Sequence, residues 1–427
     1  MSSPSAPPSS SSGSKVGRAA LRTRNARQVA LDEELGRVLR ANRLLAFVTP
    51  KNAAAERERL VQAVTRGVVA KPAWDAVAPP LADVQVESRR SVERMHELAA
   101  QLPGTPLYQR RLTELDLDLQ LLAAVGSPRK VRPLARRRYG HGGEPAFPHL
   151  PAGPTLRELA ERLLADTPPD PEEKVVPPSG QGSLAELARR VARVLDLDIR
   201  VRIEPHLVSG AAAGERTMFI AERLFGAREA RRLVVHEVLG HLVAAFNGRT
   251  QPLGIFALGT GGAYADQEGM CITLEEEAGL LDASRLRALA ARVLTTDWVH
   301  EGATFAESAR ALHEDYGFSA ERAVVLSERA FRGGGVARDL VYLRSWLRVR
   351  HALRTAPRTM DRLRLGKVSL DDLPELEWLA RERWVDLGPR YLPGLSLARS
   401  LASTGGGTSL DTSPPKRQTS LQRLDDT

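Results

Sequence analysis

Two histidines five residues apart, with a glutamate beside the first, place the strongest constraint on how this chain can fold. The segment His236-Glu237-Val238-Leu239-Gly240-His241 lies within a predicted helix over Ala227–Phe246. Five residues rotate an α-helix by about 140° past a full turn, so the two rings diverge. Both can bind one metal ion only if the turn is widened, and a π-bulge widens it. Gly240 lowers the steric cost of such a distortion.

The same segment carries side chains that a metal-assisted hydrolysis requires. Two neutral imidazoles and a carboxylate are the ligands of a catalytic zinc site that keeps one position open. We therefore predict His236 and His241 as ligands of one Zn²⁺ per chain, and Glu237 as the general base. The alternative is that both histidines are only packed or hydrogen-bonded within the helix.

A downstream acidic segment offers the third ligand. Asp266 is predicted to cap a helix that runs to Leu281, and Glu268 on that helix would complete a His₂Glu site. Glu275 lies seven residues after Glu268, on about the same helix face, and is a candidate to orient a histidine N–H. For the acidic run 275–277 the alternative is a solvated helix face.

Composition and hydrophobic pattern divide the whole chain into five predicted parts. Residues 1–28 are predicted as a disordered basic tail, with a transit peptide as the alternative. Residues 29–150 are predicted as a helical region, 151–182 as a proline-rich connection, 183–402 as the catalytic region and 403–427 as a second disordered tail.

The catalytic region combines helices with short strands. Residues 199–203 alternate in polarity, as a half-buried strand does, and 218–221 predict a second short strand. The helix over Ala227–Phe246 is predicted to stop at Asn247-Gly248. The fold class is therefore α+β and mainly helical, with a small β-sheet beside the helix of His236 and His241.

Cysteine count, hydropathy and charge exclude several classes. The single cysteine, Cys271, excludes a disulfide framework and fits a reducing compartment, so we expect a cytoplasmic protein. No apolar run is long enough for a transmembrane helix, and we expect no membrane partner. The formal net charge is +9, and the basic run 129–138 is predicted as a solvated loop. Phosphates, RNA or an acidic protein tail are its alternative ligands, but without a nucleic-acid motif we do not expect nucleic acid.

Five segments of the chain resemble those of a known family. Gln267-Glu268-Gly269-Met270-Cys271 resembles the QEGLA motif of bacterial metallopeptidase-like proteins, whose animal members are the microtubule-associated tyrosine carboxypeptidases. The other matching segments, within about residues 30–400, are the His-Glu segment, Phe47-Val48-Thr49-Pro50-Lys51-Asn52-Ala53, Phe331-Arg332-Gly333-Gly334-Gly335 and Arg338-Asp339-Leu340-Val341-Tyr342-Leu343.

The resemblance implies a zincin-like peptidase fold and a carboxypeptidase reaction on the C-terminus of a peptide or protein. It implies zinc on His236, His241 and Glu268, with Glu237 as base. A carboxypeptidase also needs a cation for the terminal carboxylate, and Arg332 and Arg338 are the candidates.

Two further expectations complete the sequence-based hypothesis. Tyr342 is a candidate donor to the developing oxyanion, with a half-buried structural tyrosine as the alternative. The alternative function is a non-catalytic binding protein with a structural or vestigial metal site and a basic surface for acidic partners. The intact Glu237 favours the enzyme, because a purely structural site needs no carboxylate beside its ligand.

Overall fold

The computed structural model describes residues 21–68, 70–78, 80, 82–168, 175–205 and 207–403. Most of the two predicted tails, residues 1–20 and 404–427, lies outside these described residues. The described chain is mainly helical with small sheets, which agrees with the α+β class. No helix in these ranges is both long and apolar enough to cross a bilayer.

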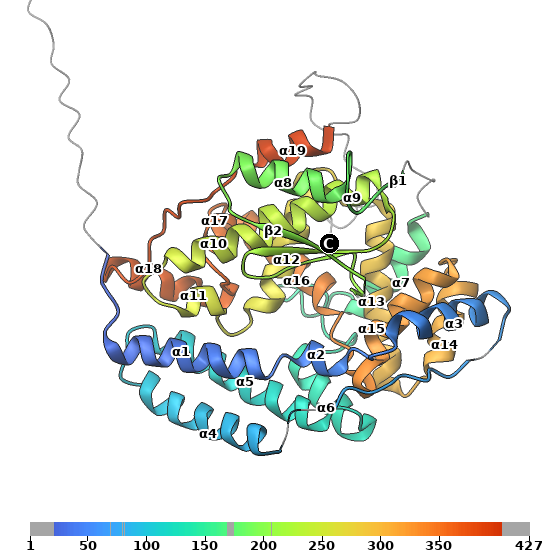
Figure 1. Cartoon of the computed structure of the whole chain (residues 1–427), viewed down its shortest axis with the longest axis horizontal. Coiled ribbons are helices and arrows are strands. Elements are labelled where there is room, and N and C mark those ends of the chain that lie inside the picture. The colour runs from blue at the N-terminus through green and yellow to red at the C-terminus, as the bar shows by residue number, and fades with distance from the viewer. Residues whose placement is uncertain are drawn as a thin grey trace, which may run out of the picture.

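Six helices come first in the chain; five of them pack together along one edge of the molecule, whereas α3 (Ala53–Thr65) packs on α14 (Phe305–Glu314) and α15 (Ala320–Gly335) (Figure 1). The six are α1 (Ala26–Ala41), α2 (Leu44–Val48), α3 (Ala53–Thr65), α4 (Ala82–Ala99), α5 (Thr105–Ala124) and α6 (Pro128–Tyr139). The basic run predicted as a loop is therefore helix α6, and this prediction was wrong. Arg138 of that run is largely buried and pairs with Glu114 and with Asp118, so part of the run serves internal packing.

The range predicted as a proline-rich connection contains a helix, α7 (Leu156–Asp166). Thr155 and Glu158 form a capping box at its start, in which each side chain accepts from the other residue's backbone N–H. These bonds satisfy two N–H groups that a helix otherwise leaves unpaired, and the apolar face of α7 packs on α13 (Ala283–Glu301).

Both strands expected from the sequence form, and they pair with each other. β2 (Arg200–Glu204) runs parallel to β4 (Thr217–Ala221), with Ile203 opposite Ile220. β3 (Ala211–Ala213) pairs antiparallel with β4 and forms an edge of this three-stranded sheet. A second, two-stranded sheet joins β1 (Val175–Val176) to β5 (Phe225–Gly226).

The remaining helices complete the described chain. They are α8 (Leu184–Val194), α9 (Ala227–Val234), the π-helix η1 (Val235–Leu242), α10 (Val243–Thr250), α11 (Ile255–Leu258), α12 (Ala263–Glu277), α14 (Phe305–Glu314), α15 (Ala320–Gly335), α16 (Val341–Thr355), α17 (Thr359–Leu363), the 3₁₀ turn η2 (Leu370–Asp372), α18 (Leu373–Arg381) and α19 (Leu395–Ser403). Among them, α8, α9 and η1 contact the strands.

Two predicted helix ends were wrong, for the same physical reason. The helix continues through Asn247-Gly248 to Thr250, because the Asn247 amide donates to the carbonyl oxygens of Arg364 and Tyr391 instead of ending the helix. Asp266 is not a cap, since α12 begins after Gly262. Its carboxylate instead accepts from the Ser369 hydroxyl at 2.7 Å. In both cases a tertiary hydrogen bond overrides a local preference.

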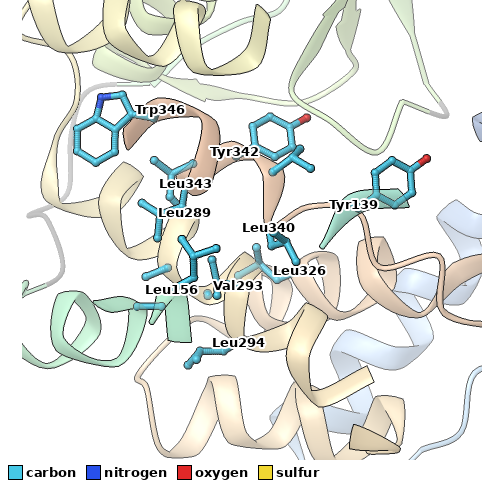
Figure 2. Close-up of a cluster of buried hydrophobic side chains, with 14 of the residues drawn as sticks. Tyr139, Leu156, Leu289, Val293, Leu294, Leu326, Leu340, Tyr342, Leu343 and Trp346 are labelled. Carbon is cyan, nitrogen blue, oxygen red and sulfur yellow. The ribbon is translucent and has the colours of Figure 1, made fainter. Parts of the chain in front are cut away.

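Helix α12 lies between two hydrophobic clusters. Ile272 faces a cluster built from α7, α13 and α16, whereas Met270 and Leu274 face the cluster around the three-stranded sheet. Figure 2 shows Tyr342 and Trp346 of α16 at the edge of the first cluster. Helix α12 is consequently held on both sides, and side chains on it have fixed positions.

The close approach of α12 and α16 depends on Gly269. A Cβ added to Gly269 would lie 2.3 Å from the backbone oxygen of Ser345, a contact that neither helix can relieve without moving. We expect Gly269→Ala to lower the free energy of unfolding by about 1–3 kcal/mol, as overpacking does. Gly36→Ala in α1 is the matched control, because its nearest neighbour is the flexible end of Arg40. Urea unfolding of both variants tests this, and equal stability would contradict the packing argument.

Candidate active site

The helix that carries the two histidines is widened. A continuous helical segment changes from α9 to the π-helix η1 at Val235 and returns to α10 at Val243. A π-helix repeats its hydrogen bonds every five residues, so residues at that spacing come onto one face. The rings of His236 and His241 accordingly lie with centroids 5.0 Å apart. The predicted π-distortion is confirmed.

Gly240 has a packing role that the sequence did not reveal. A Cβ at this position would lie 2.3 Å from the Cys271 sulfur on α12. The glycine therefore lets α12 approach the π-helix closely. This approach brings α12, with Glu268, beside the two histidines.

The Glu268 carboxylate lies between the two imidazoles. Its Oε2 is 3.2 Å from Nε2 of His236 and 3.8 Å from Nε2 of His241. Burial opposes its charge, yet hydrogen bonds from the two histidines hold the pKa of Glu268 well below its usual value. The structure thus brings together all three residues predicted as metal ligands.

Glu275 orients His236 from the opposite side of the ring. Its Oε1 is 2.6 Å from Nδ1 of His236, which leaves Nε2 facing Glu268. Arg285 donates to both Glu275 oxygens, at 2.9 and 3.0 Å. Glu275 is fully buried, and although burial opposes its charge, Arg285 and Arg232 lower its pKa to about 2. The alternative of a solvated acidic face is wrong for this residue.

These two carboxylates favour a positive charge at the centre. Burial opposes protonation of His236, but Glu268 and Glu275 raise its pKa to about 9. A metal cation on Nε2 would replace the proton that bridges His236 and Glu268. The donor set therefore fits a cation held by two imidazoles and one carboxylate.

Cys271 is a candidate ligand that the sequence analysis missed. Ligand atoms of His236, His241 and Cys271 lie within 4.8 Å of one another. Cys271 follows Glu268 by three residues on α12, so helical spacing alone could have signalled it. Burial raises the pKa of its thiol well above the usual value, and Cys271 does not line either cavity beside the histidines. We therefore favour the ionised Glu268 as the third ligand.

Two cavities meet at His236 and Glu237. The larger has a volume of about 760 Å³ and is lined also by His241 and Glu268. The smaller, of about 470 Å³, lies between the sheet and α15. Tyr342 and Arg329 also line both cavities, so the two cavities are adjacent around Glu237.

A glycine kink brings Arg332 into the larger cavity. Arg332 has extended backbone dihedral angles inside α15, and Gly333 and Gly334 follow with φ of +67° and +90°. Side-chain-bearing residues rarely adopt such angles, which explains the glycines after Arg332. Arg338 enters the same cavity from the segment before α16. In the described part of the chain neither arginine pairs with a carboxylate within 4 Å.

Basic side chains outnumber acidic ones around both openings. Burial, with repulsion from Arg329 and Arg338, lowers the pKa of Arg332 to about 10. In the smaller cavity burial and repulsion from Arg292 lower the pKa of Arg322 to about 9. Crowded guanidinium groups of this kind favour an anionic ligand.

The protein has a mainly helical α+β fold. This fold places a buried centre of two histidines and one carboxylate beside a cavity lined with arginines, as a metal-dependent hydrolase would need. The model of the microtubule-associated tyrosine carboxypeptidase family matches residues 77–404, and the chain belongs to this family. The resemblance inferred from the sequence is confirmed. No curated protein and no solved structure matches the chain.

The buried Asp339 anchors the arginines behind the cavities. Its carboxylate accepts a hydrogen bond from Arg329 and lies 3.9 Å from Arg292. Burial opposes its charge, but Arg329 and Arg292 lower the pKa of Asp339 to about 2. A lowered folded-state pKa contributes stability that is present above the unfolded pKa of about 4 and is lost as pH falls toward 2.

Asp339→Asn should therefore destabilise the protein at pH 7 by about 3–5 kcal/mol, because it leaves Arg329 buried without its counter-charge. The difference from wild type should shrink as pH is lowered from 4 to 2. The matched control is Asp198→Asn, which removes an exposed aspartate from its pair with Arg216 and should change stability by less than about 1 kcal/mol. Denaturant unfolding at several pH values measures both, and a pH-independent Asp339→Asn effect would contradict this linkage.

Proposed function

We propose that the protein is a zinc-dependent carboxypeptidase with a zincin-like active site, which removes residues from the C-terminus of a peptide or protein. One observation carries the proposal: the Glu268 carboxylate lies within 4 Å of two imidazole nitrogens, with Glu237 in the same cavity. Family membership supports the reaction class. His236, His241 and Glu268 would hold the zinc ion.

Several residues of the chain would have separate roles in peptide hydrolysis. Zinc, when bound, supplies Lewis acidity toward the scissile carbonyl and the attacking water. Glu237 takes a proton from that water and passes it to the leaving amine. Tyr342, at the junction of both cavities, donates to the oxygen on which negative charge develops. Glu275 and Arg285 keep the His236 ring oriented.

The arginines explain how a chain end could be selected. Arg332 and Arg338 line the larger cavity and would bind the terminal carboxylate. The smaller cavity, lined by Arg232, Arg292 and Arg322, would receive the chain before the scissile bond and favours acidic residues there. An acidic protein tail is therefore the substrate that we propose.

The first test concerns the metal. Purified protein should contain about one zinc per chain, and His236→Ala, His241→Ala and Glu268→Ala should each lose it, because each removes a ligand. Glu275→Ala should weaken zinc binding by about 10- to 100-fold. Cys271→Ser is the control and should keep the metal. Elemental analysis and chelator competition measure these effects, and zinc loss in Cys271→Ser with retention in Glu268→Ala would reverse the assignment.

The second test concerns the general base. Glu237→Gln should keep the zinc and the fold but lower hydrolysis by about 10²-fold or more, since the amide cannot take a proton. Peptide cleavage followed by mass spectrometry measures the rate. A wild-type protein that binds zinc but cleaves no member of a peptide library would support the non-catalytic binding protein instead.

The third test concerns the peptide end. One peptide in free-acid and amidated forms should be cleaved with a strong preference for the free acid. Arg338→Ala should lower kcat/KM for the free acid by about 30- to 150-fold, the cost of a lost charge-assisted contact. Arg344→Ala, which breaks an ion pair with Glu144 outside both cavities, is the control. Equal cleavage of both forms by wild type would indicate an endopeptidase, and an unchanged preference in Arg338→Ala would move the role to Arg332.

A further inference from the structure

Four residues that line the larger cavity carry a buried side-chain atom without a hydrogen-bond partner in the described part of the chain. The atoms are Nε of Arg111, Oε1 of Gln267, the hydroxyl of Tyr264 and Nε of Arg338. Three of the four can donate a hydrogen bond, and we consider Tyr264 and Arg338 together. A buried donor without an acceptor costs about 1–3 kcal/mol, so native proteins seldom retain one without a reason. The three donors among these atoms point to a ligand that supplies acceptors.

The two groups are neighbours. The guanidinium carbon of Arg338 lies 4.7 Å from the centroid of the Tyr264 ring, within the range of a cation–π contact. This contact orients the guanidinium against the ring, so that Arg338 and Tyr264 form one unit. A phenol is neutral at pH 7 and can donate one hydrogen bond, while Nε of arginine can donate another.

The position of Tyr264 in α12 separates it from the reacting bond. Tyr264 precedes Glu268 by four residues and therefore lies one turn away on the same helix face. It lines only the larger cavity, with Arg332 and Arg338, whereas Tyr342 lines both cavities where they meet at Glu237. The two tyrosines thus suit different parts of a substrate.

We propose that Tyr264 is a specificity-determining residue that binds the terminal carboxylate of the substrate together with Arg338. Its hydroxyl donates to one carboxylate oxygen, and Arg338 donates to the other. This inference rests on the proposed carboxypeptidase function and adds a neutral donor to the arginine contact. An amidated chain end offers one acceptor in place of two and no charge, so it satisfies the pair less well.

Binding to an inactive enzyme isolates this step from catalysis. In the zinc-loaded Glu237→Gln protein, the dissociation constants of one acidic peptide, as free acid and as amide, are measured by calorimetry. Adding Tyr264→Phe removes one oxygen atom and keeps the ring. We expect the affinity for the free acid to fall about tenfold or more and the affinity for the amide to stay nearly unchanged.

Tyr342→Phe is the matched control, because it deletes the same atom from the other tyrosine of the cavity. In the active enzyme it should lower the turnover of both peptides by the same factor and keep their ratio, while Tyr264→Phe lowers the ratio. If Tyr264→Phe weakens the binding of acid and amide equally, or weakens neither, the proposal is wrong while the carboxypeptidase function stands. If the wild-type enzyme itself does not prefer the free acid, the carboxypeptidase function fails first.

Discussion

The widened turn in η1 is the constraint on which the rest of the site depends. An α-helix would direct His236 and His241 away from each other, and no side chain from α12 could then reach both. With the π-helix in place, one carboxylate oxygen of Glu268 approaches both rings. The absence of a Cβ at Gly240 lets α12 come near enough for that contact. Helix geometry and glycine placement therefore determine how these three side chains are arranged.

Carboxylates surround this centre, and arginines in turn surround the carboxylates. The carboxylates of Glu268 and Glu275 surround His236 and favour a cation there. Beyond them lie arginines: Arg285 holds Glu275, and Arg329 holds Asp339. Other arginines, such as Arg332, have no such partner among the described residues and face the cavities instead. Arginines around a centre that favours a cation favour an anionic ligand, and the chain end of an acidic substrate is the ligand that we propose.

Much of the site could be predicted because its central residues lie in two segments that are close together along the chain. The spacing of the two histidines requires a widened turn, and Glu268 and Glu275 share one face of the next long helix. What could not be predicted depends on contacts between distant segments. Aspartate commonly caps helices, but the carboxylate of Asp266 accepts a hydrogen bond from Ser369 instead. Asn247 remains helical because its amide donates to the carbonyl oxygens of Arg364 and Tyr391. The contact of Tyr264 with Arg338 becomes visible only when α12 is packed against its neighbours, whereas the helical spacing from Glu268 could have signalled Cys271.

Zinc K-edge X-ray absorption of the purified protein tests the central claim most directly, because it reports the metal's ligands in solution. With His236, His241 and Glu268 as ligands, the spectrum should contain only nitrogen and oxygen neighbours at about 2.0–2.2 Å, with the scattering pattern of imidazole rings. A sulfur neighbour at about 2.3 Å would show that Cys271 binds the metal, and this result would contradict the assignment of Glu268.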